Sequence, residues 1–475
     1  MNKLIKHISV NGIILCVLFV SLINTSAFTS ENFNRIDEYI LDSMHQSKIS
    51  ALTLTIIQEN EVIYQKVYQT GDFKYHLDLD TPFYIGSIGK SITALAIKQL
   101  SNEGLLDINE NVSRYLPWFN LVDDRGNEIK VRDLIRHRSG LSTIDGNMAY
   151  TYNTDYSIEE LSQLITNKVH INNLIGNINS YSNLNYIVLG AIIEKISGLD
   201  YDTYVKQNIY KPLHMNHTYH SYDEAKENGL LPGYRVINGI RIPVNVPHPV
   251  AHVPAGFQLS STSDMTNYVL MLMNQGIFES KSLFVNNVLS SDSKVYDPYW
   301  QEIEIEDEYY GHTGTTFSST SQMLINQRQK IGILLLTNAR DVSSTHPITA
   351  AVMSEGVISL LKGVSYHNPK WDFNWAIFSI NLLFISFLVI DCIFFRRYLN
   401  MSHRYSLKRK IRFFIVDGIL PVIFLSIIKN YFDVSWNFMI NASPEYSWIV
   451  IFSCVGLVII AWMRIVYTLL RRKIK

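Results

Sequence analysis

A serine and a lysine stand three positions apart, directly before a helical pattern. The stretch is Ser87-Ile88-Gly89-Lys90, and apolar residues three and four apart follow it as far as Leu100. Three residues is just under one helical turn, so Ser87 and Lys90 share a helix face. A serine hydroxyl becomes an effective nucleophile when a neighbouring base takes its proton, and a buried lysine with a lowered pKa can be that base. The pair alone is a weak signal, because Ser291 and Lys294 repeat its spacing.

Two further stretches carry groups that acyl transfer needs. Tyr181 and Asn183 stand just before a second helical pattern. The phenol can relay a proton from Ser87 to a leaving group, and the amide can hold a substrate carbonyl. His312 and Gly314 stand in a predicted strand, where the histidine can hydrogen-bond a substrate and the glycine lets its backbone approach. Each stretch alone is weak, because Tyr398 and Asn400 repeat the spacing of Tyr181 and Asn183, and the third stretch could be an ordinary strand end. The hypothesis therefore depends on the three stretches together.

The surrounding segments predict the elements that must position these residues. In chain order we expect a helix over 31–48, a hairpin over 51–57 and 62–68, mostly helices from 87 to 198, a helix over 264–274, strands over 322–326 and 331–336, and a helix over 347–361. Strands near both ends of this region imply one sheet assembled from distant segments. A helical lobe is then inserted between them, with the site in the groove between sheet and lobe.

Charge divides the chain into two unlike parts. Of 41 Lys+Arg and 42 Asp+Glu, residues 367–475 hold 14 and 5, which leaves 27 and 37 for the preceding part. An acidic body argues against nucleic acid as a partner. The three cysteines all lie in apolar runs, and no zinc or phosphate motif stands out, so neither a metal nor another cofactor is expected.

Apolar runs at both ends predict export and a membrane anchor. Residues 1–27 have the basic start, apolar centre and small-residue end of a cleaved signal peptide. Residues 371–475 contain three apolar runs, at about 375–395, 413–428 and 448–470. The middle run is the weak one, because it is short and contains an aspartate and a proline.

Basic residues set the expected orientation of these runs. They cluster between the first and second runs and again after the third. Both clusters favour the cytoplasm, so the prediction is a multi-pass protein of the cytoplasmic membrane with three crossings and the body, residues 28–365, outside. Asp391, Asp417 and Arg464 then lie at similar depths, and we expect them to meet inside a three-helix transmembrane bundle. The alternative is that each side chain extends separately to the nearby membrane interface.

Taken in order, the three chemical stretches resemble the serine β-lactamase and penicillin-binding D,D-peptidase superfamily, most of all its class C β-lactamase and esterase branch. The stretches Val131 to Leu141 and Pro254 to Met265 resemble it too, so the likeness covers about residues 31–362. It implies an α/β fold in which helices flank an antiparallel sheet and a helical lobe is inserted. It also implies an acyl-enzyme on Ser87, with an oxyanion hole formed by the backbone N–H groups of Ser87 and Thr315.

The resemblance also narrows the expected activity. His312 stands where β-lactamases of this branch have lysine, which is similar to the esterase and peptidase members. With C-terminal membrane helices, the chain resembles the colibactin-maturing prodrug peptidase and membrane-anchored penicillin-binding-protein-like proteins. By the same likeness, His252 is expected to line the acyl or side-chain pocket, with an ordinary buried histidine beside a turn as the alternative.

These likenesses imply a serine peptidase that cleaves acyl-peptides containing D-amino acids, of prodrug or peptidoglycan type. Its partners would then be a peptide or acyl-peptide substrate and membrane lipid. An acylated sensor with little turnover and a carboxylesterase are the alternatives.

Overall fold

The structure is a computed structural model. It describes residues 30–119, 121–122, 124–148, 156–171, 174–237, 239–244, 248–279, 281–282, 309–342, 347–368, 375–401, 405–432, 436, 439–440 and 444–473. The predicted signal peptide, residues 1–27, lies outside the described residues.

The main sheet has five strands, in the order β2-β1-β11-β10-β9, and all neighbours are antiparallel. Its strands are β1 (Ala51–Gln58), β2 (Glu61–Gln69), β9 (Tyr310–Thr315), β10 (Thr320–Asn326) and β11 (Ile331–Thr337). Because β1 pairs with β11, the sheet joins segments from both ends of the body, as the sequence predicts. The predicted strands agree with the observed ones to within two residues at each end.

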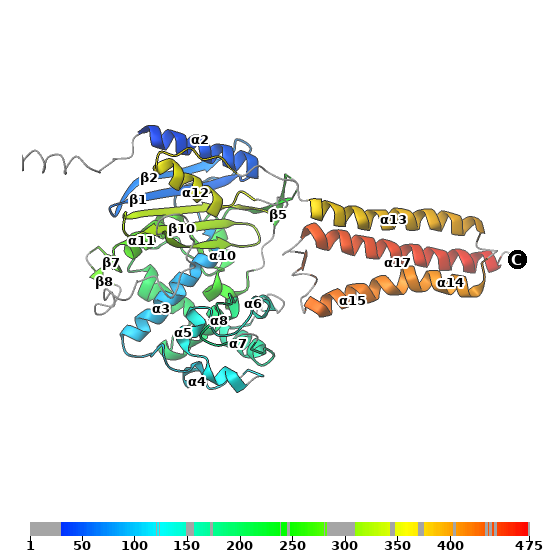
Figure 1. Cartoon of the computed structure of the whole chain (residues 1–475), viewed down its shortest axis with the longest axis horizontal. Coiled ribbons are helices and arrows are strands. Elements are labelled where there is room, and N and C mark those ends of the chain that lie inside the picture. The colour runs from blue at the N-terminus through cyan, green and yellow to red at the C-terminus, as the bar shows by residue number, and fades with distance from the viewer. Residues whose placement is uncertain are drawn as a thin grey trace, which may run out of the picture.

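Helices cover both faces of this sheet (Figure 1). Two of them, α2 (Ser30–Ser47) and α12 (Ala350–Leu361), pack on one face, and α11 (Thr262–Met273) packs on the other. On β11, Ile333 and Leu335 join the core under α2 and α12, while Leu334 and Leu336 join the core on the opposite side. Alternate residues of a strand face opposite ways, so a strand covered on both faces reads as one continuous apolar run.

A helical lobe lies beside the sheet and is inserted between β2 and β9 in the sequence (Figure 1). Its helices are α3 (Gly89–Asn102), α4 (Val112–Tyr115), α5 (Val131–Ile135), α6 (Thr143–Met148), α7 (Ile158–Thr166), α8 (Asn183–Ser197), α9 (Tyr201–Val205) and α10 (Tyr222–Glu227). The central helix α8 packs against α3, α5, α6 and α7. Ten successive α8 residues, from Leu184 to Ile193, are buried, so α8 forms the core of the lobe.

Three small sheets complete the body. One pairs β3 (Phe83–Tyr84) with β6 (Leu259–Ser260), which ties the segment before Ser87 to the segment after Gly256. Another joins β12 (Ala339–Asp341), β4 (Gly233–Ile237) and β5 (Ile240–Val244). The third is the short hairpin of β7 (Ile277–Phe278) and β8 (Lys281–Ser282).

The C-terminal region forms long helices that lie side by side and extend away from the body (Figure 1). They are α13 (Trp375–Met401), a helical run made of α14 (Leu407–Phe414), the π-helical segment η7 (Ile415–Ile419) and α15 (Leu420–Phe432), and then α17 (Pro444–Lys473). One helix among the described residues, over Ser447–Leu470, is long and apolar enough to cross a membrane. The structure therefore contains the three predicted helices, and the length and composition of one of them fit a membrane span.

The weak middle run is continuous with α14 and longer than predicted. The five-residue segment η7 adds a π-bulge just before Pro421. Pro421 is the second residue of α15 and lacks the N–H of an ordinary helix residue, and the π-helical segment lies directly before it, where the regular hydrogen-bond ladder of the continuous helix is interrupted.

Asp391, Asp417 and Arg464 meet between these helices, as the sequence predicts. The Arg464 guanidinium lies 2.6 Å from Asp391 Oδ1 and also pairs with the Asp417 carboxylate. All three residues are buried, at 8%, 7% and 3% exposure. A buried guanidinium between two carboxylates links α13, η7 and α17.

Candidate active site

Ser87 lies where a short strand turns into a helix. It is the middle residue of a 3₁₀ turn, η1 (Gly86–Ile88), between β3 and α3. Gly86 has a φ of +55°, and a Cβ there would come within 2.5 Å of the backbone nitrogen of Thr315. Only glycine fits such a position. The turn therefore holds Ser87 against the end of β9 and at the N-terminal end of α3, where the helix dipole favours negative charge.

Lys90 is fully buried and contacts Ser87 from the first turn of α3. Its Nζ lies 3.1 Å from Ser87 Oγ and 2.7 Å from Asn183 Oδ1, and it also contacts the carbonyl of Ala255. Burial lowers the pKa of Lys90 well below its ordinary value. A neutral amine has two N–H bonds and one lone pair. Two acceptors can take the N–H bonds, which leaves the lone pair for the Ser87 hydroxyl.

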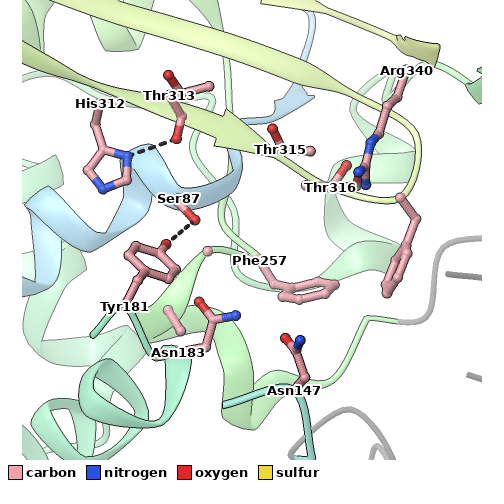
Figure 2. A pocket seen from close by; sticks show the side chains of 13 residues that line it. Ser87, Asn147, Tyr181, Asn183, Phe257, His312, Thr313, Thr315, Thr316 and Arg340 are labelled. Atoms are coloured by element: carbon pink, nitrogen blue, oxygen red, sulfur yellow. Dashed lines mark hydrogen bonds between the residues drawn. The ribbon is translucent and has the colours of Figure 1, made fainter. Parts of the chain in front are cut away.

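Tyr181 contacts the same hydroxyl. Its O–H donates to Ser87 Oγ at 2.7 Å (Figure 2). Burial raises the pKa of Tyr181 to about 12, so the phenol keeps its proton at neutral pH. The geometry therefore divides two roles, a base at Lys90 and a proton relay at Tyr181.

A histidine that the sequence analysis did not single out supports Tyr181 from behind. The rings of His137 and Tyr181 pack against each other, with centroids 4.3 Å apart and planes tilted by 31°. His137 Nδ1 lies 3.1 Å from the backbone nitrogen of Ser182 and 3.0 Å from Asn185 Nδ2, both of which are donors. Burial, with a smaller contribution from Lys90, lowers the pKa of His137 well below its ordinary value. His137 is thus a neutral acceptor that fixes the loop carrying Tyr181.

The edge strand β9 forms one wall of the site. Thr316 N donates to Ser319 O at 3.0 Å, and the alternation of an antiparallel ladder then directs the backbone groups of Thr315 and Thr313 away from β10. The N–H of Thr315 is thus on the side of Ser87, as an oxyanion hole requires. His312 Nδ1 lies 2.8 Å from Thr313 O. Burial, then the nearby Lys90, lowers the pKa of His312 to about 4, so its ring is neutral at pH 7.

Gly314 differs from the prediction. It is expected to let a substrate backbone approach, but it is absent from the cavity lining. A Cβ on Gly314 would come within 2.0 Å of Ile85 O and 2.1 Å of Ser321 Oγ. Successive residues of a strand face opposite ways, so the space at Gly314 is used by the protein's own packing against the Ser87 turn.

His252 also differs from the prediction that it lines the pocket. It is fully buried in a 3₁₀ turn, η5 (Val250–Ala255), and is absent from the cavity lining. Its ring meets that of Phe257 edge-on, with centroids 5.8 Å apart. The turn directs His252 into the core, and Phe257 takes the place at the cavity surface.

The residues enclose a cavity of about 460 Å³. Its lining consists of Ser87, Asn147, Tyr181, Asn183, Ala255, Gly256, Phe257, His312, Thr313, Thr315, Thr316, Phe317 and Arg340 (Figure 2). Ser87, Tyr181, Asn183, His312 and Thr315 are thus brought together as predicted, with Lys90 directly beneath them. Asn147, Phe257, Phe317 and Arg340 were not predicted. They come from separate segments of the chain. Arg340 follows closely after a buried strand, and this position was the one sequence feature that could have indicated a residue at the edge of the sheet.

Together these groups can carry out acyl transfer. Ser87 can attack a carbonyl while Lys90 takes its proton, and Tyr181 can return a proton to the leaving group. The N–H groups of Ser87 and Thr315 can stabilise the oxyanion. Among the described residues, no cluster of three His, Cys, Asp or Glu could hold a metal ion.

Comparison with known proteins decides the family. A model of the Beta-lactamase family matches residues 36–356, more than half of the chain. The chain belongs to the β-lactamase family. The sequence-based resemblance to β-lactamases and penicillin-binding proteins is confirmed, and so is the β-lactamase-like α/β fold.

Several relatives within this family are similar to the chain. Protein flp of Staphylococcus aureus (strain N315) is 26% identical over 320 residues, which cover 65% of this chain and 64% of that protein. The chain thus spans less than two thirds of the length of the flp proteins. The N-acetylmuramyl-L-alanine amidase of Bacillus subtilis (strain 168) is 25% identical over 389 residues, covering 68% and 84%.

Two solved structures share the β-lactamase fold. The octameric penicillin-binding protein homologue from Pyrococcus abyssi aligns with a TM-score of 0.57 and 23% identity, covering 70% of this chain and 78% of that one. FmtA from Staphylococcus aureus aligns with a TM-score of 0.57 and 22% identity, covering 72% and 89%. At these identities the likeness concerns the fold alone.

Proposed function

We propose that this β-lactamase-family protein is a serine peptidase that cleaves acyl-peptides containing D-amino acids through an acyl-enzyme on Ser87. One observation carries the proposal. The Ser87 hydroxyl has a buried lysine of lowered pKa 3.1 Å away and a protonated tyrosine 2.7 Å away. A base and a separate proton relay support a complete cycle, in which acylation releases the leaving group and water then removes the acyl group.

A peptide-like substrate suits the cavity wall. The edge strand β9 presents the backbone groups of Thr313 and Thr315, to which an extended chain can add as a further strand. The amidase named among the relatives supports amide hydrolysis as a reaction of this family. Neutral His312 in place of a lysine supports a peptidase or esterase over a β-lactamase.

Multiple-turnover kinetics on matched substrates test this proposal. We expect the full chain to cleave an N-acyl-D-alanyl anilide through many cycles, and its L-enantiomer far more slowly. Product release that stops after one equivalent indicates an acylated sensor. Cleavage of an aryl ester with no cleavage of either anilide indicates a carboxylesterase. Either outcome contradicts the peptidase.

We further propose that the C-terminal helices anchor the body outside the cytoplasmic membrane, with three crossings. The span over Ser447–Leu470 has a mean hydropathy of 2.5 and supports the last crossing. The contacts of α13 and η7 with α17 through the Arg464 ion pairs support a common depth for all three helices. Basic residues between α13 and α14 and at the C-terminus support a cytoplasmic location for both.

Cysteine labelling separates three crossings from one. The background is a chain that carries Cys392→Ser and Cys454→Ala. In this background, the new cysteine of Ser402→Cys should be protected from an impermeant maleimide in intact cells. A cysteine at Asn441 should react. A single crossing by α17 predicts that both positions react, which would overturn the three-crossing topology.

A further inference from the structure

A chain of polar side chains connects α9 with the first turns of α3. We call it the Gln258 network, and its members are Asp202, His220, Tyr210, Gln258, Tyr201 and Thr93. None of the six lines the cavity, and all except Asp202 are buried. Burial of polar groups costs free energy unless each finds a partner. The contacts of the six residues show which part of the active site the network supports.

The outer part of the network orients Gln258. His220 Nδ1 lies 2.8 Å from Asp202 Oδ1, and His220 Nε2 lies 2.7 Å from the Tyr210 hydroxyl. The same hydroxyl lies 3.2 Å from Gln258 Oε1. Asp202 is held in turn by Lys206, whose Nζ is 3.0 Å from its carboxylate. A hydroxyl beside Oε1 decides which way the Gln258 amide faces, because only the oxygen end of an amide accepts hydrogen bonds.

Tyr201 contacts the nitrogen end of this amide. Gln258 Nε2 donates to the Tyr201 hydroxyl oxygen at 3.0 Å. In a regular α-helix Tyr201 and Tyr210 would lie on opposite faces, because their separation in the chain makes about 2.5 turns. The π-helical segment η4 (Lys206–Tyr210) follows α9 directly and changes this rotation. The irregular helix thus supplies both phenols to one amide.

Gln258 itself lies against the turn that carries Ser87 and Lys90. Its side chain is fully buried, and Nε2 is 3.4 Å from Gly89 O. A Cβ on Gly89 would come within 3.1 Å of Gln258 Cδ, so the amide packs directly on the first residue of α3. The backbone carbonyl of Gln258 accepts from Ile85 N at 3.1 Å. One residue therefore contacts the chain on both sides of Ser87.

Thr93 connects the network to a second support of Lys90. Thr93 Oγ1 lies 2.6 Å from the Tyr201 hydroxyl and donates to Pro254 O at 2.7 Å. Pro254 directly precedes Ala255, whose carbonyl contacts Lys90 Nζ. Thr93 thus holds the η5 turn against α3, one residue away from the carbonyl that accepts from the amine.

We propose that Gln258 is a positioning residue for Lys90, and that its network holds the α3 turn and the Ala255 carbonyl where Lys90 needs them to act as a base. This inference rests on the proposed function, because it assumes that Lys90 takes the proton of Ser87. If the η5 turn moves away from α3, water reaches the amine, stabilises its charged form and raises the pKa of Lys90. The network therefore acts on the protonation of the base and not on the binding of substrate.

The pH profile of Ser87 labelling distinguishes this role from a general loss of stability. Gln258→Met keeps an unbranched side chain of similar length and removes the amide. In the full chain treated with a fluorophosphonate, we expect the labelling rate of Gln258→Met to fall about tenfold on the rising part of the profile and less than about twofold on its plateau. A rise of about one unit in the pKa of Lys90 has this effect. The variant leaves in place the titratable side chains that face Lys90 in the described part of the chain, which are Tyr181, Tyr186, His137 and His312.

Position 93 offers a matched pair of variants. Thr93→Val keeps the shape of the side chain and removes the hydroxyl, whereas Thr93→Ser keeps the hydroxyl. Thr93→Val should lower the rate about threefold on the rising part of the profile, and Thr93→Ser should stay close to wild type. Tyr201→Phe should act as Thr93→Val does. Tyr204→Phe is its control, because Tyr204 is a buried residue of the same helix outside the network, and it should leave the profile unchanged.

The outcomes separate this proposal from the proposed function. A folded Gln258→Met with the wild-type profile, or with an equal loss at every pH, overturns the positioning role. If Gln258→Met does not fold, identical profiles of Thr93→Val and Thr93→Ser overturn it instead. Absence of labelling in the wild-type protein contradicts the acyl-enzyme on which both proposals depend. A wild-type rate that falls with rising pH contradicts Lys90 as the base.

Discussion

Lys90 in the body and Arg464 in the C-terminal helices are both buried basic side chains, with opposite consequences. Lys90 is 0% exposed, and its contacts among the described residues are a hydroxyl, an amide oxygen and a backbone carbonyl. Arg464 is 3% exposed and contacts two carboxylates. A buried amine without a negative partner loses its proton and becomes a base, whereas a guanidinium between two carboxylates forms ion pairs that link helices. The difference in partners makes one region catalytic and the other structural.

Removing the base should have the largest effect. Lys90→Ala should lower acylation of Ser87 and turnover by about 10²- to 10⁴-fold, since loss of a general base typically costs this much. Lys98→Ala is the matched control, because Lys98 lies on the same helix α3, is half-buried and lies outside the cavity lining. Stopped-flow labelling by a fluorophosphonate measures both. Equal rates for Lys90→Ala and Lys98→Ala would show that another group takes the proton.

Removing Arg464 should change stability and spare the chemistry. Arg464→Leu leaves Asp391 and Asp417 without their guanidinium, and breaking a buried pair costs about 3–5 kcal/mol. We expect a clear fall in protein level and melting temperature, measured in membranes and in detergent. The surviving protein should keep its labelling rate per molecule. Lys408→Leu, at an exposed position of α14, serves as the control and should change neither.

The double exchange of Asp417 and Arg464 sharpens this prediction. Exchanging both residues keeps one guanidinium and one carboxylate in contact, so the double variant should be more stable than either single variant. Additive losses would mean that the three helices are held by their apolar contacts and that the ion pairs contribute little.

The pH dependence of the reaction tests the role of Lys90. Because burial lowers the pKa of Lys90, its amine becomes neutral as pH rises through a value well below 10.5. The rate of Ser87 labelling should therefore rise about tenfold per unit below that pKa and then level off. Tyr181, with a pKa of about 12, should cause no fall below about pH 11. A rate that falls as the pH rises through the pKa of Lys90 would contradict a lysine base.

His137 should have the smallest of these effects. His137→Asn keeps a side chain that tolerates the backbone φ of +53°, but removes the ring that packs on Tyr181. We expect a fall of about 3- to 10-fold in kcat, little change in KM, and a pH profile that still levels off at the pKa of Lys90. A profile shifted by more than one pH unit would assign His137 to the proton transfer itself.

Local pattern accounts for much of what the sequence predicted correctly. Ser87 and Lys90 lie one turn apart on the same helix, so their contact follows from helix geometry alone. The strand β11 is recognisable in the sequence as a continuous apolar run, because both of its faces are buried. Asp391, Asp417 and Arg464 could be matched by depth, since each stands at a known distance from its helix end.

Tertiary contacts decide where the structure places Gly314 and His252, which are absent from the cavity lining. Gly314 and Thr313 are neighbours on β9, and only the position of Ile85 decides which of them faces the cavity. His252 lies within η5, and Phe257 follows it by five residues. The path of the chain through η5 turns His252 into the core and brings Phe257 to the cavity surface. Arg340 enters the cavity because β12 pairs with β4, which no local pattern indicates.

The most direct test of the central claim is to locate the acyl group. After reaction with a fluorophosphonate probe, peptide mapping by mass spectrometry should find one adduct per chain, on the peptide that contains Ser87. The folded Ser87→Ala variant should carry none. An adduct on another serine, or full labelling of Ser87→Ala, would contradict the assignment of Ser87 as the nucleophile.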